Sequence, residues 1–132
     1  MKAIEVDSLT KKFGDFKAVD NISFQIEEGE IFGFLGPNGA GKSTTMMILT
    51  TLLKPTSGSA LVGGYDVMSD AKKVREKIGY VQQEISVDEF LTGRENLYLH
   101  ARINQIPSNL IKSRIDDVLE LVELVEKKDQ AT

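Results

Sequence analysis

A glycine-rich loop at residues 36–44 constrains this chain more than any other feature. It reads GPNGAGKST and has the spacing G-x-x-x-x-G-K-[ST]. Because glycine has no Cβ, its three glycines allow the backbone to adopt positive φ and to approach a ligand closely. The amide groups of such a loop form a nest for anionic oxygens, and a helix that begins near Lys42 adds the positive end of its dipole. The loop therefore predicts a binding site for phosphate groups.

The polar residues of the loop have distinct expected roles toward a nucleotide. Lys42 should reach the β- and γ-phosphates as a point charge, and the Ser43 hydroxyl should ligate Mg²⁺. The loop residues expected to contact the nucleotide are Asn38, Gly39, Ala40, Gly41, Lys42, Ser43 and Thr44. The alternative is a glycine-rich turn that binds nothing.

The residues on either side of the loop strengthen the prediction. Residues 31–35 form a short continuous apolar run, which is typical of a buried parallel strand. After the loop comes an apolar helix that should end before Pro55, and its expected buried residues are Met46, Met47, Ile48, Leu49, Leu52 and Leu53. Strand, loop and helix in this order are the context that the motif requires.

The composition excludes several other classes of protein. The 132 residues suffice for one domain with a core, and the net charge of -4 gives no basic face for nucleic acid. Without cysteine, the chain has no disulfide, thiolate-zinc or thiol chemistry. No apolar run reaches the length of a membrane span, and no signal peptide is expected at the start. We therefore expect a soluble protein whose membrane link, if any, comes through a partner.

The rest of the first two thirds alternates short strands and helices. Period-two patterns predict strands at residues 4–7 and 22–27, with a turn at 11–15 between them. A turn at 54–58, a strand at 59–62 and a Gly-Gly closure follow, and then a helix capped by Ser69 or Asp70. Another strand is expected at 78–81. Strands joined through helices around a phosphate loop predict an α/β architecture.

The last third is predicted to be helical. Thr92 and Glu95 have the spacing of a capping box, which opens one helix, and Ser108 can cap the next. The second helix carries a core-facing stripe made of Ile111, Ile115, Val118, Leu119, Val122 and Val125.

These pieces together resemble the ATP-binding domain of ABC transporters. The loop matches that family's phosphate loop almost letter for letter. Residues 78–84 resemble the strand that leads into the family's Q-loop, which aligns Gln83 with the glutamine that touches Mg²⁺ and the attacking water. Phe13 aligns with the aromatic residue that stacks on adenine. Residues 86–97 look like the drug- and polyketide-exporting branch, whose membrane subunits are of the ABC-2 type.

The resemblance implies a partial α/β domain of the P-loop NTPase type. It would have a mixed or parallel core sheet, an antiparallel strand region and a C-terminal helical segment. Residues 1–90 would be the N-terminal part of the nucleotide-binding core, and residues 91–132 would begin the helical subdomain.

The resemblance also implies a site and partners. ATP and Mg²⁺ would be the cofactors. Phe13 and Ala18 would join the loop in binding the nucleotide, Ser43 and Gln83 would hold the metal, and Lys42 and Gln83 would act in catalysis. The partners would be an ABC-2-type membrane permease and a second copy of the ATP-binding domain, with no nucleic acid. The protein would lie peripherally on the cytoplasmic face of the cell membrane.

The chain resembles only the first half of such a domain. The family's signature loop, its strand ending in Asp-Glu, its D-loop and its switch histidine would come after residue 132. His100, the only histidine, is expected to be a surface or packing residue. We therefore expect these 132 residues to bind nucleotide at most, with negligible ATPase activity. Residues 31–35 would lack a neighbouring strand, so the chain should self-associate there, or its loop should be partly disordered.

Two alternatives stay open. One is a soluble ABC protein that serves DNA repair, iron–sulfur assembly or translation, although residues 86–97 favour exporters. The other is a non-enzymatic, phosphate-binding or self-assembling half-domain. Stacking on Phe13 tolerates any base, so GTP remains an alternative to ATP.

Overall fold

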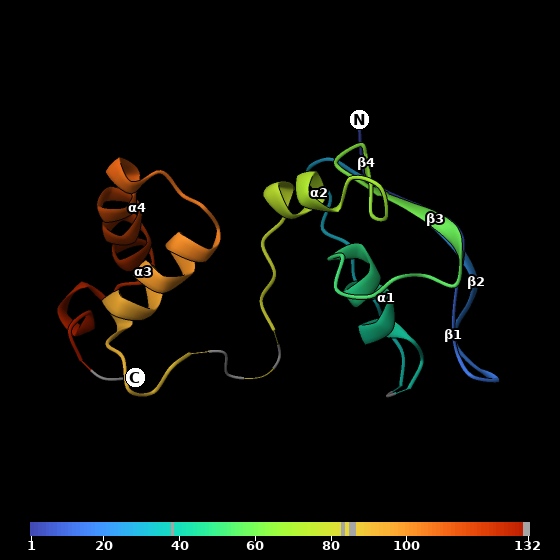
Figure 1. Ribbon diagram of the computed structural model, residues 1–132, viewed down its shortest axis with the longest axis horizontal. Coiled ribbons are helices and arrows are strands. Elements are labelled where there is room, and N and C mark those ends of the chain that lie inside the picture. Colours follow the sequence, from blue (N-terminus) through green and yellow to red (C-terminus); the bar gives the residue numbers. More distant parts are fainter. Residues whose placement is uncertain (38, 83, 85–86, 131–132) are drawn as a thin grey trace. The chain divides into compact units, whose positions relative to one another are not determined.

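The protein divides into two compact units, Met1–Tyr80 and Val81–Thr132 (Figure 1). The structure is a computed structural model that describes residues 1–37, 39–82, 84 and 87–130. Each unit has its own small hydrophobic core.

The first unit is built on an antiparallel sheet with the strand order β2-β1-β3-β4. The strands are β1 (Lys2–Phe13), β2 (Phe16–Glu27), β3 (Ser57–Val62) and β4 (Tyr65–Asp66). The predicted period-two strands are confirmed, but both are longer than expected: residues 11–13, assigned to a turn, continue β1, and only Gly14 and Asp15 make the turn. The strand predicted at 59–62 is confirmed as part of β3, and the two glycines after it close a hairpin with β4, a strand that was not predicted.

Two helices cover one face of this sheet. They are α1 (Lys42–Leu49) and α2 (Ala71–Lys77). The core between helices and sheet consists of Val6, Leu9, Ile48, Leu49, Ala60, Val62, Val67 and Val74. The predicted start of α1 at Lys42 is confirmed, but only some of the residues that were expected to be buried are buried. Met46 and Met47 are each 37% exposed and Leu52 is 57% exposed, because the helix ends at Leu49 and turns only one side to the sheet.

The run at 31–35 does not form the predicted strand. Its residues have no regular secondary structure, and Ile31 and Leu35 are 100% and 97% exposed. Phe32 and Phe34 instead pack on Phe24 of β2, with ring centroids 5.5 and 5.2 Å from it. A strand needs a neighbour that accepts and donates backbone hydrogen bonds. The sheet in the described part of the chain offers none beside this run, so only its aromatic face is covered.

The predicted strand at 78–81 is absent for the same reason. Ile78 is extended and packs against the core, but Tyr80 is 41% and Val81 94% exposed. Every strand pair found in the described residues is antiparallel. The α/β class and the antiparallel region are thus confirmed, while the parallel core strands do not form.

The second unit is a helical hairpin. It consists of α3 (Gly93–Ile103), α4 (Ser108–Leu121) and a short 3-10 turn, η1 (Val125–Lys127). The capping box is confirmed: the Glu95 amide donates to Thr92 Oγ1 at 3.2 Å, and the Thr92 amide donates to Glu95 Oε2 at 2.8 Å. The predicted cap at Ser108 is wrong, because Pro107 occupies that position and Ser108 is the first helical residue.

The core of the hairpin uses only part of the predicted stripe. Its buried residues are Ala101, Ile111, Ile115 and Leu119. Val118 is 43% exposed, since α3 covers only one side of α4. Val122 and Val125 are 52% and 46% exposed, and both lie beyond the end of α4 at Leu121, so the predicted helix is too long. His100 is exposed in the last turn of α3, as expected for a surface residue.

Candidate functional site

A cleft of about 400 Å³ lies between the end of the β1–β2 hairpin and the start of α1. Its lining residues are Phe13, Phe16, Ala18, Gly39, Gly41, Lys42, Ser43 and Thr44. All of them except Phe16 were predicted from the sequence as nucleotide contacts. The fold thus brings the predicted aromatic residue and the phosphate loop to one place, although Phe13 and Gly39 are 26 positions apart along the chain.

A close backbone approach fixes the loop against the hairpin. Gly41 has φ 85°, and a Cβ added there would lie 2.3 Å from the carbonyl oxygen of Ala18. Only glycine fits at this junction, because any side chain would collide with the backbone of β2 and would also be strained at this φ. The glycine that the motif requires therefore holds the loop beside the hairpin.

The first turn of α1 is left open toward the cleft. Its N-cap is Gly41, which has no side chain to accept a hydrogen bond, and its first turn carries no acidic residue. The first amide groups of a helix have no partners within the helix, and they carry the positive end of its dipole. An uncapped helix start at the floor of a cleft suits an anion, and a phosphate group in particular.

Lys42 supplies the cationic group of the site. Its half-buried side chain folds back over the loop, and Nζ donates to the carbonyl oxygens of Gly36 and, at 3.1 Å, Pro37. No ion pair found in the described part of the chain involves Lys42. Its positive charge is therefore not neutralised by a carboxylate and is available to a phosphate.

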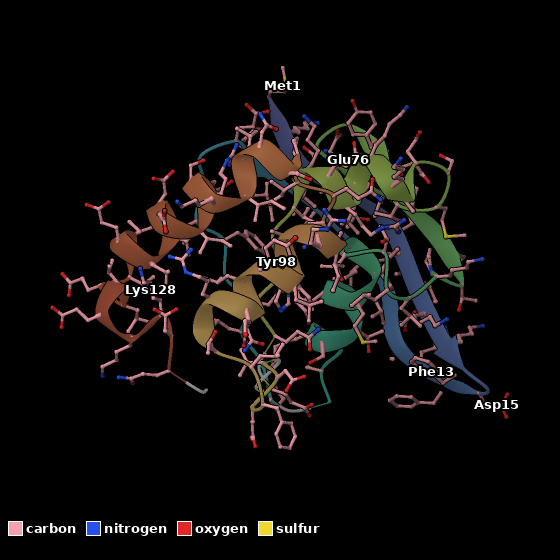
Figure 2. All side chains as sticks on the ribbon, turned by 60° about the vertical axis from the view of Figure 1, so that its left-hand side comes forward. Met1, Phe13, Asp15, Glu76, Tyr98 and Lys128 are labelled. Atoms are coloured by element: carbon pink, nitrogen blue, oxygen red, sulfur yellow. The ribbon has the colours of Figure 1, made fainter. Side chains whose placement is uncertain are left out.

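The aromatic end of the cleft lies at the tip of the hairpin. Phe13 and Phe16 face each other across the Gly14–Asp15 turn, and they are 51% and 63% exposed. Lys11 Nζ lies 5.2 Å from the centroid of the Phe13 ring. Figure 2 shows Phe13 close to Asp15 at the end of the hairpin. The sequence shows a phenylalanine on each side of Gly14-Asp15, but the turn was predicted at 11–15, and the position of Phe16 opposite Phe13 emerges only when the two strands pair.

The remaining predicted site residues are less well placed or lie outside the described residues. Asn38 and Gln83 lie outside them. Ala40 is exposed, and its amide donates to the Pro37 carbonyl at 3.2 Å instead of lining the cleft.

Ser43 is the one predicted metal ligand that the structure describes. It is exposed and lines the cleft, so its hydroxyl offers a hard oxygen donor beside the phosphate loop. Mg²⁺ is commonly held by one or two protein oxygens together with the phosphates of its substrate and water. The site therefore fits this ion. No cluster of three or more acidic or histidine side chains suited to a metal occurs among the residues described.

A larger hollow of about 620 Å³ lies over the polar face of the sheet, and Glu5 and Asp7 are among its lining residues. It contains no loop residue and no lysine or arginine. Carboxylates repel phosphate groups, so this hollow does not compete with the cleft as a nucleotide site.

Comparisons with known proteins agree with this geometry. The profile of a family described as "ABC transporter" matches residues 19–132. The chain is 41% identical over 124 residues to the daunorubicin resistance ATP-binding protein DrrA3 of Streptomyces coeruleorubidus, covering 94% of this chain and 39% of that protein. It is 53% identical over 94 residues to the probable multidrug ABC transporter ATP-binding protein YbhF of Escherichia coli, covering 71% of this chain and 16% of that protein.

A solved structure of an ATP-binding cassette also matches the fold of this chain. The ATP-binding cassette MJ0796, determined as a dimer in a post-hydrolysis state with ADP and Pi, superposes with a TM-score of 0.79 at 28% identity, covering 97% of this chain and 61% of that chain. The chain thus spans well under half the length of the two relatives described above. With the family profile extending over residues 19–132, the chain belongs to the ABC transporter family and contains an N-terminal part of its ATP-binding domain.

Proposed function

We propose that this chain binds ATP together with Mg²⁺ in the cleft, as the ATP-binding part of a drug-export ABC transporter. The observation that carries the proposal is the uncapped start of α1 with Lys42 over the same loop, anchored beside an aromatic hairpin tip. An anion site and an unneutralised cation suit the phosphates of a nucleoside triphosphate, and an aromatic surface suits its base.

Each element takes one part of the nucleotide. The loop amides and the start of α1 hold the phosphates, Lys42 exchanges its loop carbonyls for the β- and γ-phosphates, and Phe13 stacks on the base. Ser43 would hold Mg²⁺, which would supply charge neutralisation at the phosphates. Gln83 is proposed to orient the attacking water in the whole protein, where hydrolysis would drive transport.

The partners of the whole protein are proposed from the relatives. MJ0796 was solved as a dimer, and DrrA3 and YbhF are named as drug-resistance and multidrug transport proteins. We propose a second ATP-binding subunit and an ABC-2-type membrane permease, with the chain held peripherally at the cytoplasmic face. The permease would determine the cargo. Among the described helices, none combines the length and the apolar character needed to cross a bilayer.

The second unit offers a surface for the permease. A groove of about 580 Å³ follows α3 and α4, lined by Leu91, Arg94, Glu95, Tyr98, Leu99, Arg102, Ser108, Ile111, Lys112 and Ile115. Tyr98 and Leu99 are 51% and 44% exposed in it. An apolar groove with a charged rim is the usual character of a protein docking site.

Titration calorimetry of Mg-ATP onto the chain tests the proposed function. We expect saturable binding at one site per chain and a higher melting temperature in excess ligand, because only the folded chain has the site. Absence of binding would refute the proposed function for this chain.

Ser43→Ala tests the metal role within the same site. We expect the variant to bind ATP in EDTA as the wild type does, but to lose most of the gain in affinity that Mg²⁺ gives the wild type. The reason is that the change removes one metal ligand and leaves the loop amides unchanged. Ser113→Ala, in the second unit, is the matched control. An unchanged magnesium effect in Ser43→Ala would assign the metal to other ligands.

The bare side of residues 31–35 predicts self-association. Two large apolar side chains, Ile31 and Leu35, are almost fully exposed beside backbone that is in no sheet. We expect light scattering to show dimers or larger species of the wild type at micromolar concentrations, and the double variant Ile31→Lys, Leu35→Lys to be monomeric. A monomeric wild type would contradict this prediction.

A further inference from the structure

We propose that Phe16 is a second base-contacting residue, so that the cleft holds a purine nucleotide on a platform of two aromatic rings. The inference rests on the proposed function, because it concerns the base end of the same site. It assigns a role to a residue that lies outside the glycine loop and is not the aromatic residue aligned with the family's adenine contact.

The register of the hairpin places the two rings on one side of it. Phe13 and Phe16 are direct partners across the antiparallel pair, immediately before and after the turn. Directly opposed residues project to the same face of a strand pair, with Cβ atoms about 4.5–5.5 Å apart. Both side chains line the same cleft as the phosphate loop. The hairpin therefore presents two rings to a ligand whose phosphates lie on the loop.

Phe16 also has a fixed position relative to the loop. It stands two residues before Ala18 on β2, and both line the cleft, as the period of a strand requires. The Ala18 carbonyl is the atom that Gly41 approaches so closely that no Cβ fits between them. Only Lys17 separates Phe16 from Ala18 on β2, so the ring lies close along the strand to the residue that the loop approaches, at the point where the register of the hairpin shifts.

The surface of Phe16 is open to a ligand. It is the more exposed ring of the pair, at 63% against 51% for Phe13. Lys11 lies over Phe13 at 5.2 Å, whereas the cation–π contacts found in the described residues include none to Phe16. The ring-to-ring contacts of those residues join Phe24, Phe32 and Phe34 and do not join Phe13 to Phe16. The two rings are therefore not stacked on each other, and Phe16 has an aromatic face to offer.

Covering these rings with a base is favourable for two reasons. It removes exposed apolar surface from water, and stacking adds an attraction that every base can make. A purine has a larger ring system than a pyrimidine and covers more of a two-ring surface. The pair therefore favours purine over pyrimidine nucleotides without selecting between adenine and guanine.

The first experiment uses calorimetry with two probes. Mg-ATP occupies both ends of the cleft, whereas magnesium tripolyphosphate occupies only the phosphate loop. For Phe16→Ala we expect about a five- to tenfold loss of affinity for Mg-ATP and no change for tripolyphosphate. The ratio of the affinities for ATP and UTP should also be smaller in Phe16→Ala than in the wild type. Phe90→Ala removes a ring that is 96% exposed in the second unit, and it should change neither affinity.

A second experiment observes the contact directly. The chain contains no tryptophan, so Phe16→Trp introduces a single tryptophan, whose emission can be excited selectively over that of the three tyrosines, and retains an aromatic ring. We expect Mg-ATP to change its emission and tripolyphosphate to leave it unchanged, with the ATP affinity kept close to that of the wild type. Phe90→Trp is the control and should respond to neither probe.

The outcomes separate this inference from the proposed function. If the wild type binds both probes and Phe16→Ala binds ATP as tightly as the wild type, the inference is overturned and the proposed function stands. If Phe16→Ala weakens ATP and tripolyphosphate equally, the ring only supports the loop, and the inference is again overturned. If the wild type binds neither probe, both fail.

Discussion

Replacement of Lys42 by alanine is expected to weaken Mg-ATP binding by at least about 100-fold, which corresponds to about 3 kcal/mol. In the structure the ammonium group donates to the carbonyl oxygens of Gly36 and Pro37. When nucleotide binds, the same donors can turn to phosphate oxygens, where the ammonium charge meets a negative charge instead of a neutral carbonyl. Alanine keeps the start of α1, since its helix propensity is the highest of all residues.

Titration calorimetry measures this loss, and circular dichroism verifies that the variant is folded. Lys54→Ala, which removes an exposed lysine after α1 and outside the cleft, is the matched control and should bind as the wild type does. If Lys42→Ala bound Mg-ATP within tenfold of the wild type, the loop amides alone would account for phosphate binding, and the role given to Lys42 would be wrong.

Gly41→Ala is expected to cost at least about 2 kcal/mol of the free energy of unfolding and to abolish nucleotide binding. The new Cβ would lie 2.3 Å from the Ala18 carbonyl oxygen, so the loop and β2 would have to separate. The residue would also retain φ 85°, which is strained for alanine. Because this contact positions the loop beside the hairpin tip, its loss should open the cleft.

The variant Gly64→Ala distinguishes the effect of a steric clash from the effect of backbone strain. Gly64 has φ 80°, but a Cβ there would meet no atom within 4 Å. Gly64→Ala should therefore lower the free energy of unfolding only by the cost of backbone strain, about 1–2 kcal/mol in urea denaturation, and should bind Mg-ATP as the wild type does. Equal losses of stability in the two variants, with binding retained in both, would show that the approach of Gly41 to Ala18 does not hold the site together.

The features that the sequence predicted correctly are those with local causes. The glycine pattern determines the loop and the start of α1 at Lys42. The spacing of Thr92 and Glu95 determines a capping box, and Gly63 and Gly64 end the strand that was predicted at 59–62. In each case the residues that decide the conformation lie within a few positions of one another, so no knowledge of the tertiary structure is needed.

The predictions that failed depended on a neighbour. Residues 31–35 have the composition of a buried strand, but composition does not supply the adjacent strand that would pair with them. The stripe of α4 has the correct period, yet Val118 stays exposed because α3 covers only one side of α4, and Val122 lies beyond the end of the helix. Phe16 was missed for a related reason: its significance comes from facing Phe13 across a turn, which emerges only when the two strands are paired.

The open start of α1 has a consequence for the order in which the site forms. In many helices the side chain of the N-cap residue accepts a hydrogen bond from an amide of the first turn. The N-cap of α1 is Gly41, which has no side chain to do so. A bound phosphate would accept hydrogen bonds from the same amides and so serve as the missing cap. The bound nucleotide then completes the first turn of α1. Hydrogen exchange at the first amides of the helix should therefore slow when the nucleotide binds, because the start of the helix becomes ordered as the ligand binds.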